Sequence, residues 1–171
     1  FTDTDEDFRL SSYHYLRPVD ELKRGARPGS AIARGEALVY SPIPLHTSLL
    51  QLDADSVGVA VEVSRSILGY TGERNYSYPR QLAQHVCDTG LAHPLVRDEI
   101  FAQLLRHLTL NPSAHSTRRG WVLLLVVLTC FAPTEHFENT VEAFLRGQGE
   151  SHCVNALHRT VFTGAVAEPP S

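Results

Sequence analysis

The chain has 171 residues, enough for one domain with a well-packed core, and 43% of them are hydrophobic against 20% charged. This composition is typical of a globular protein and excludes a chain dominated by disorder or low-complexity sequence. The formal net charge of -4 gives no general electrostatic case for nucleic acid or an anionic membrane as the main partner.

Residues 1–37 are predicted to be an extended, partly irregular N-terminal segment. The segment begins acidic, carries an aromatic lead-in at Phe8, Tyr13 and Tyr15, and ends in a stretch rich in Gly, Pro and Arg. No basic segment followed by an apolar run opens the chain, so we expect no secretory signal and a cytoplasmic protein. The chain holds no Met, even at position 1, which favours a fragment or a processed product.

The first predicted helix lies between Asp55, a candidate N-cap, and Gly69 or Gly72, candidate stops. One face of this helix is marked, at helical spacing, by Val57, Ala60, Val61, Ser64 and Leu68. A second helix is expected to begin at Pro79, because proline suits a first turn, and to stop at Gly90.

The clearest helical periodicity comes next. Pro94 begins this helix, and the pair Asn111-Pro112 ends it. Its apolar side consists of Val96, Ile100, Phe101, Leu104, Leu105 and Leu108. Ser116 is the expected cap of the following helix, whose apolar stretch from Trp121 to Ala132 is too short to span a membrane and is predicted to be buried.

Two further helices are predicted. Thr134 opens the first, which ends near Gly147 and has an apolar face of Phe137, Val141, Phe144 and Leu145. The second runs toward Gly164 and carries Val154, Leu157 and Val161. Because no run of alternating strand residues occurs, the predicted fold class is all-α, a compact irregular bundle built around the Trp121 helix.

Catalytic and metal-binding motifs are absent from the sequence. There is no nucleophile elbow, no phosphate-binding loop and no dinucleotide fingerprint, so we expect no enzyme activity, no catalytic residue and no cofactor. A zinc site from His85, Cys87, His152 and Cys153 is the alternative, but its spacing matches no standard zinc motif. We favour buried reduced thiols at Cys87, Cys130 and Cys153, and no metal.

Two features carry most of the remaining charge. Asp98 and Glu99, beside Arg97, resemble an acid/base pair, but carboxylates in the first turn of a helix also stabilise its N-terminus, and we favour that structural role. Residues 64–120 hold seven arginines and four acidic residues. Six of the seven, all but Arg97, are called the arginine cluster, which is either a solvated face or a patch for an acidic partner: Arg65, Arg74, Arg80, Arg106, Arg118 and Arg119.

Several of these segments, taken in order, resemble the myosin tail homology four domain over most of residues 38–171. The matching segments are Ile67-Leu68-Gly69-Tyr70-Thr71-Gly72, Gly90-Leu91 with Pro94, Arg97-Asp98-Glu99-Ile100, Asn111-Pro112, Arg119-Gly120-Trp121 and Phe144-Leu145. We therefore predict a domain over residues 38–171 with an N-terminal extension over residues 1–37.

The resemblance implies a non-catalytic, helical protein-binding module of an unconventional myosin tail. Such a module binds cargo or adaptor proteins, usually together with a following FERM domain, and belongs to cytoplasmic, cytoskeleton-associated proteins of actin-rich protrusions. Any ATPase activity belongs to a motor domain outside this chain. The alternative is a microtubule-binding or membrane-adaptor scaffold module of a pleckstrin-homology-containing protein. Neither implies nucleic acid as a partner or direct membrane insertion.

The resemblance also bears on particular residues. Arg97, Asp98, Glu99 and Trp121 match the family's motif and are expected to be structural, with Trp121 buried in the core. The candidate partner-binding residues are Arg74, Arg80, Arg118 and Arg119, at predicted helix ends that can cluster in a bundle. The alternative partner-binding surface is the aromatic lead-in.

Overall fold

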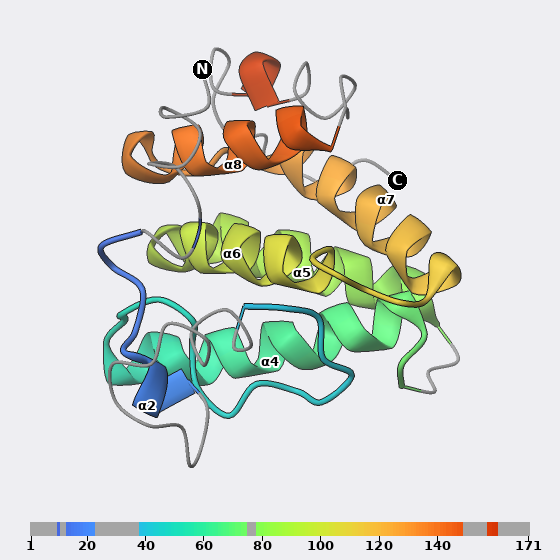
Figure 1. Cartoon of the computed structure of the whole chain (residues 1–171), viewed down its shortest axis with the longest axis horizontal. Coiled ribbons are helices and arrows are strands. Elements are labelled where there is room, and N and C mark those ends of the chain that lie inside the picture. The colour runs from blue at the N-terminus through green and yellow to red at the C-terminus, as the bar shows by residue number, and fades with distance from the viewer. Residues whose placement is uncertain (1–9, 11–12, 23–37, 75–77, 149–156, 161–171) are drawn as a thin grey trace.

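The computed structural model describes residues 10, 13–22, 38–74, 78–148 and 157–160 (Figure 1). In these ranges the chain forms a bundle of helices with one isolated β-bridge and no β-strand, which confirms the all-α class. No helix of this described part is long and apolar enough to cross a membrane. Phe8, Val154 and Val161, which we had assigned to the lead-in and to the last helix, lie outside the described residues.

The leading segment packs against the helical bundle. Residues 15–17 run antiparallel to residues 49–51: the amide of Arg17 donates to the carbonyl of Leu49 at 2.9 Å, and the amide of Gln51 to that of Tyr15 at 2.8 Å. The short helix α2 (Val19–Leu22) follows. Leu16 and Leu22 are buried in the same core as the later helices. The domain boundary at residue 38 stays a prediction.

Helices α4 (Ala54–Thr71) and α5 (Pro79–Ala92) form the first pair. Asp53, and not Asp55, is the N-cap of α4, since its side chain accepts from the amide of Ser56 at 2.8 Å. Of the two predicted stops, Gly72 ends α4 in the left-handed conformation, with a φ of 97°, and Gly69 lies within the helix. Helix α5 begins at Pro79 as expected but continues through Gly90.

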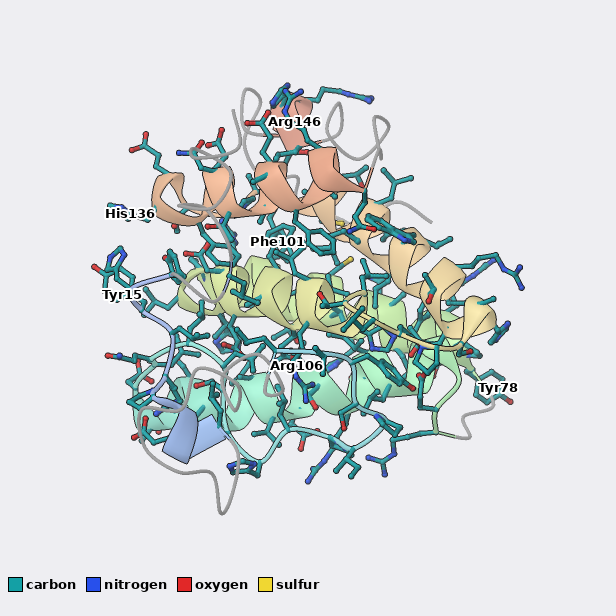
Figure 2. All side chains as sticks on the ribbon, viewed as in Figure 1. Tyr15, Tyr78, Phe101, Arg106, His136 and Arg146 are labelled. Carbon is teal, nitrogen blue, oxygen red and sulfur yellow. The ribbon has the colours of Figure 1, made fainter. Side chains whose placement is uncertain are left out.

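Helix α6 (Arg97–His107) is the centre of the bundle, where we had expected the Trp121 helix. Pro94 opens a 3-10 turn (Pro94–Val96), so α6 begins three residues later than predicted. Eight of its eleven residues are buried, and it packs against α4, α5, α7 and α8. Figure 2 places Phe101 in this central layer, between α6 and α8.

Helices α7 (Ala114–Cys130) and α8 (Glu135–Gly147) complete the core. The N-cap of α7 is Ser113, and the predicted cap Ser116 is instead buried beside His107. Leu124 and Leu128 face the core, whereas Leu125 is 37% exposed. Thr134 precedes α8 as predicted. Residues 157–160 form a helical turn that packs on α7, because the Thr160 hydroxyl donates to the carbonyl of Leu128.

The helices alternate in direction, so their ends gather at two opposite ends of the molecule. Helices α4, α6 and α8 begin at one end, and α5 and α7 begin at the other (Figure 1). The start of α7 lies against the end of α4, since a Cβ added at Gly72 would lie 3.4 Å from Nε2 of His115. This packing brings three segments of the arginine cluster to a single end.

Candidate protein-binding site

The candidate site lies at the end where α5 and α7 begin, which we call the basic end. Arg74 follows α4, Arg80 lies in the first turn of α5, and Arg118 lies near the start of α7; all three are exposed. The first turns of α5 and α7 hold no acidic residue. The partial positive charges of these two helix N-termini therefore add to the arginine charges.

Arg119 differs from the other three predicted contacts because it points inward. Its Nε donates to the carbonyl of Tyr70, and its guanidinium lies 4.5 Å from the centroid of the Tyr70 ring. This double contact ties α7 to the last turn of α4. Arg119 therefore holds the two helices of the basic end together, and its guanidinium is used within the protein instead of facing a partner.

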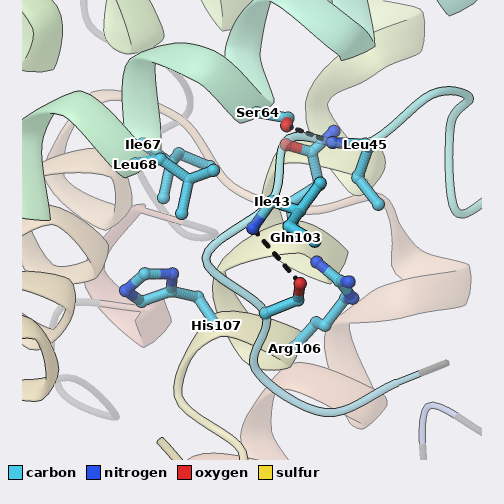
Figure 3. Close-up of a pocket in the computed structure, with 9 residues that line it drawn as sticks. Ile43, Leu45, Ser64, Ile67, Leu68, Gln103, Arg106 and His107 are labelled. Atoms are coloured by element: carbon cyan, nitrogen blue, oxygen red, sulfur yellow. Dashed lines mark hydrogen bonds between the residues drawn. The ribbon is translucent and has the colours of Figure 1, made fainter. Parts of the chain in front are cut away.

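The rest of the arginine cluster lies elsewhere. Arg65 forms an exposed pair with Glu62 on α4, at 2.9 Å. Arg106 lies on α6 and lines a small cavity between α4 and α6 with His107 and Gln103 (Figure 3). The volume of this cavity is about 20 Å³, which is room for about one water molecule and none for an organic cofactor.

One acidic residue lies within the basic end. Glu73 precedes Arg74, and its carboxylate accepts from the Tyr40 hydroxyl at 2.9 Å and from the Thr71 hydroxyl. Desolvation disfavours its charge, but hydrogen bonds from Ser116, Thr71 and Tyr40 outweigh this cost and hold the pKa of Glu73 below its ordinary value. Glu73 is thus occupied by the protein's own donors and only partly offsets the arginines.

An exposed aromatic ring accompanies these arginines. Tyr78 is 69% exposed and, with Pro79, Arg80, Gln81 and Gln84, lines a shallow hollow on the first turns of α5. Figure 2 shows it at the far edge of the molecule from Tyr15. Our sequence analysis missed Tyr78, although an aromatic directly before a helix-starting proline is a visible signal. Tyrosine at the centre of a charged surface is a frequent anchor for protein partners.

The Arg97-Asp98-Glu99 motif holds three different segments to the start of α6. Nε of Arg97 donates to the carbonyl of Gly90 at 2.7 Å. Asp98 accepts from the amide of Thr134 at 2.8 Å and from its hydroxyl at 2.6 Å, so it fixes the start of α8. Each contact satisfies a group at a helix end that otherwise has no partner within its helix.

Glu99 makes the most buried of these contacts. Its two carboxylate oxygens accept from the amides of Leu49 and Leu50 at 2.9 and 2.8 Å, and Gln103 donates to the same group at 2.8 Å. Burial raises the pKa of Glu99 to about 7. The residue has no exposed surface, and Asp98 is occupied by Thr134, so the pair is not arranged to act as acid and base on a substrate.

Trp121 is half-buried, which corrects the expectation of a core position. Its ring stacks on Phe144 at 6.0 Å between centroids and covers the edge of the core. The outer face of α7 beside it carries Val122, which is 49% exposed.

Replacing Trp121 with Ala should therefore cost about 1–2 kcal/mol of unfolding free energy, well below the roughly 3–5 kcal/mol of a fully buried aromatic. Urea denaturation followed by circular dichroism measures this cost. Val122→Ala is the control and should change stability by less than about 0.5 kcal/mol. A loss near 4 kcal/mol at Trp121 would contradict the half-buried position.

Of the four residues of the alternative zinc site, the structure describes only His85 and Cys87. Nδ1 of His85 lies 2.8 Å from the Ser66 hydroxyl, and Cys87 and Cys130 are buried free cysteines that contact each other. His152 and Cys153 lie outside the described residues. Within the described ranges, no three His, Cys, Asp or Glu side chains lie close enough to hold a metal ion.

Comparison with known protein sequences finds similarity to motor proteins. The family model of the MyTH4 domain matches residues 83–171. The chain is 39% identical over 156 residues to the high molecular weight form of myosin-1 from Acanthamoeba castellanii, covering 91% of this chain and 10% of that protein. It is 35% identical over 111 residues to human unconventional myosin-XV, covering 64% of this chain and 3% of that protein. The chain thus spans a tenth or less of these relatives.

Solved structures share the fold. The MyTH4-FERM MF1 domain of Dictyostelium discoideum myosin VII has a TM-score of 0.81 and 21% identity, over 100% of this chain and 36% of that one. The human Myosin 7b C-terminal MyTH4-FERM domain, in complex with the harmonin-a PDZ3 domain, has a TM-score of 0.76 and 26% identity. That match covers 92% of this chain and 32% of the human one.

Proposed function

Because this chain belongs to the MyTH4 domain family, as found in unconventional myosin tails, we propose that it is a non-catalytic module that binds cargo or adaptor proteins together with a following FERM domain. The observation that carries this proposal is the basic end, where Arg74, Arg80 and Arg118 are exposed and where Arg80 lines a hollow with the exposed ring of Tyr78. The human Myosin 7b MyTH4-FERM domain, in complex with a PDZ domain, supports a protein as the partner.

The chemistry of the basic end selects an acidic partner segment. Arginine guanidinium groups bind carboxylates with two parallel hydrogen bonds, and the partial positive charges at the N-termini of α5 and α7 attract the same charge. Tyr78 offers an apolar surface to a side chain between the acidic residues. Arg119 acts through its hold on Tyr70, as a positioning residue. The partner is thus an acidic peptide segment with an apolar anchor.

The cellular setting follows from the same proposal. The module works in the cytoplasm, associated with the cytoskeleton and actin-rich protrusions, and any ATPase activity lies in a motor domain of the parent protein. A second candidate function, microtubule binding, is favoured by the same basic end, because the tails of tubulin are acidic. Both candidates place the contact on one surface and differ in the partner.

Charge reversal tests the basic end. The double variant Arg74→Glu/Arg118→Glu should weaken binding of a glutamate-rich peptide about tenfold or more at low salt, since each exposed pair contributes up to about 1 kcal/mol and reversal adds repulsion. Fluorescence anisotropy measures binding of the peptide, and cosedimentation measures binding to microtubules. If the double variant loses binding to both the peptide and microtubules, the basic end binds both partners. If it loses only the peptide, the basic end is not the microtubule contact.

The matched control is Arg65→Glu/Arg146→Glu, which changes the net charge equally at exposed arginines on α4 and α8. It should leave binding within about twofold, because its charges lie away from the basic end and are screened over about 10 Å at 0.1 M salt. Arg119 is left unchanged, since its loss would disturb the packing of α7. Binding that survives the first reversal and is indifferent to salt would contradict the proposal.

A further inference from the structure

A second surface lies at the opposite end of the molecule, where α4, α6 and α8 begin. It is a groove of about 380 Å³ that we call the acidic groove, and its lining includes Tyr13, Tyr15, Asp53, Leu95, Asp98 and His136. Figure 2 shows Tyr15 and His136 near each other on the side away from Tyr78. No Lys or Arg is among the described residues that line this groove.

The rings of the groove are held in place from behind. Residues 15–17 pair with residues 49–51, which sets the backbone of Tyr15 at the groove wall. The Tyr13 ring packs edge-on against Phe137 at 4.7 Å and against Tyr15 at 5.7 Å. Desolvation, with the nearby charge of Asp98, raises the pKa of Tyr13 to about 12, so its ring stays neutral. The wall is therefore preformed.

Two apolar surfaces nevertheless stay open to solvent. Tyr15 is 47% exposed and Leu95, in the turn before α6, is 73% exposed. Both line the same groove. Exposed apolar side chains that share a concave surface are typical of a place where a partner side chain is buried.

The charge around the groove is negative. Asp53 is exposed, and its hydrogen bonds with Ser56 hold its pKa below the ordinary value, so it is ionised at neutral pH. Asp55 and Glu135 add exposed carboxylates in the first turns of α4 and α8. Asp98 is committed to Thr134, but the side chain of Asp53 can accept further hydrogen bonds.

We propose that the acidic groove binds a basic peptide segment of a partner protein, in which Lys or Arg flanks an apolar side chain. The apolar side chain packs between Tyr15 and Leu95, and a neighbouring cation lies over the exposed Tyr15 ring and pairs with Asp53. Aromatic faces and carboxylates both attract cations, so the two contacts reinforce each other. This partner is opposite in charge to the one that the basic end selects.

The charge also argues against the chain's own start as the occupant. Residues 1–9 contain Asp3, Asp5, Glu6 and Asp7 and a single basic residue, Arg9. A segment with this excess of negative charge is repelled by Asp53 and its neighbours. The two surfaces lie at opposite ends of the bundle, so one domain holds an acidic and a basic partner at the same time without competition between them.

The test uses the full chain and three synthetic peptides. The probe is Gly-Arg-Leu-Lys-Phe-Arg-Gly; the second peptide replaces its basic residues with Glu, and the third replaces its apolar residues with Gly. In a fluorescence anisotropy titration the probe should bind at the groove and the third peptide should not bind measurably; the acidic peptide should bind only at the basic end, so that Arg74→Glu/Arg118→Glu weakens its binding and leaves that of the probe unchanged. Equal binding of the third peptide would show unspecific charge attraction, and binding of the acidic peptide at the groove would overturn the proposal.

Two variants assign the contact to the groove. Asp53→Asn keeps a good N-cap for α4 while it removes the charge, and should weaken probe binding about three- to fivefold. Tyr15→Ala removes the ring and should weaken it about three- to tenfold. The matched controls are Asp88→Asn on α5 and Tyr78→Ala at the basic end, which should leave binding unchanged. Equal losses in the controls would refute the assignment.

Two further measurements exclude other occupants. If the chain that lacks residues 1–9 binds the probe more than about tenfold tighter, the chain's own segment covers the groove and the proposal fails. If sedimentation shows a dimer that Asp53→Asn and Arg118→Glu each dissociate, the basic end of a second copy is the occupant and the proposal fails likewise. A monomer whose affinity does not change on truncation supports a separate partner.

Discussion

Glu99→Ala should lower the unfolding free energy by about 3–5 kcal/mol, because two buried backbone amides lose their acceptor. The amides of Leu49 and Leu50 point at the two carboxylate oxygens, and no solvent reaches them to replace the lost bonds. The variant should also release from α6 residues 49–51 and the leading segment that pairs with them. Urea denaturation measures the cost, and faster hydrogen exchange at residues 49 and 50 would locate it.

The isosteric Glu99→Gln keeps the size and shape of the side chain and removes its titration. It is therefore the reference against which the pH dependence of the natural chain is measured. The pKa of Glu99 is about 7 in the folded chain against 4.5 ordinarily, so the folded chain binds the proton more tightly. The stabilisation that this bound proton gives is therefore complete below pH 4.5 and is lost as the pH rises through 7. The unfolding free energy falls by about 3 kcal/mol over this range.

His107 opposes this trend, and the experiment must separate the two. Burial lowers the pKa of His107 below its ordinary value of 6.5, so its contribution to stability rises with pH up to about that value. The difference in unfolding free energy between the natural chain and Glu99→Gln cancels the His107 contribution. That difference should fall between pH 4.5 and 7. A flat difference would mean that Glu99 is ionised throughout, held so by its three donors.

Gly90→Ala should lower the unfolding free energy by about 2–4 kcal/mol, although alanine is the better helix former. A Cβ at this position would lie 2.1 Å from Cζ of Phe131. The ring cannot move freely, because it is fully buried between Phe101, 5.6 Å away, and the guanidinium of Arg97 at 5.5 Å. The packing of α5 on the end of α7 must therefore shift.

Gly58→Ala on α4 is the matched control, since nothing lies within 4 Å of its added Cβ. It should stabilise the chain by about 0.5–1 kcal/mol. The Phe131→Leu background separates the clash from other effects: with the ring gone, the further cost of Gly90→Ala should fall to less than half. If Gly90→Ala stabilises the natural chain as Gly58→Ala does, the close approach to Phe131 is wrong.

The helices themselves were predictable because their signals are local. Each of these signals acts on residues within about one helical turn of itself. They are the period of 3.6 residues, the proline in the first turn at Pro79 and the left-handed glycine at Gly72. The same locality explains the errors at the caps. Asp53 and Asp55 are the same residue type two positions apart, and the sequence holds nothing that says which of them meets the amide of Ser56. The resemblance to a known family could also be recognised from the motif residues in the sequence.

The surface that each functional residue faces was decided only by the tertiary structure. Arg118 and Arg119 are neighbours in the chain, yet one is exposed while the other binds Tyr70, 49 residues away. Asp98 and Glu99 bind segments on opposite sides of them in the chain, at Thr134 and Leu49. Such contacts join residues about 36 to 50 positions apart, and the energy that selects them is the burial of whole helix faces, which no short stretch of sequence contains.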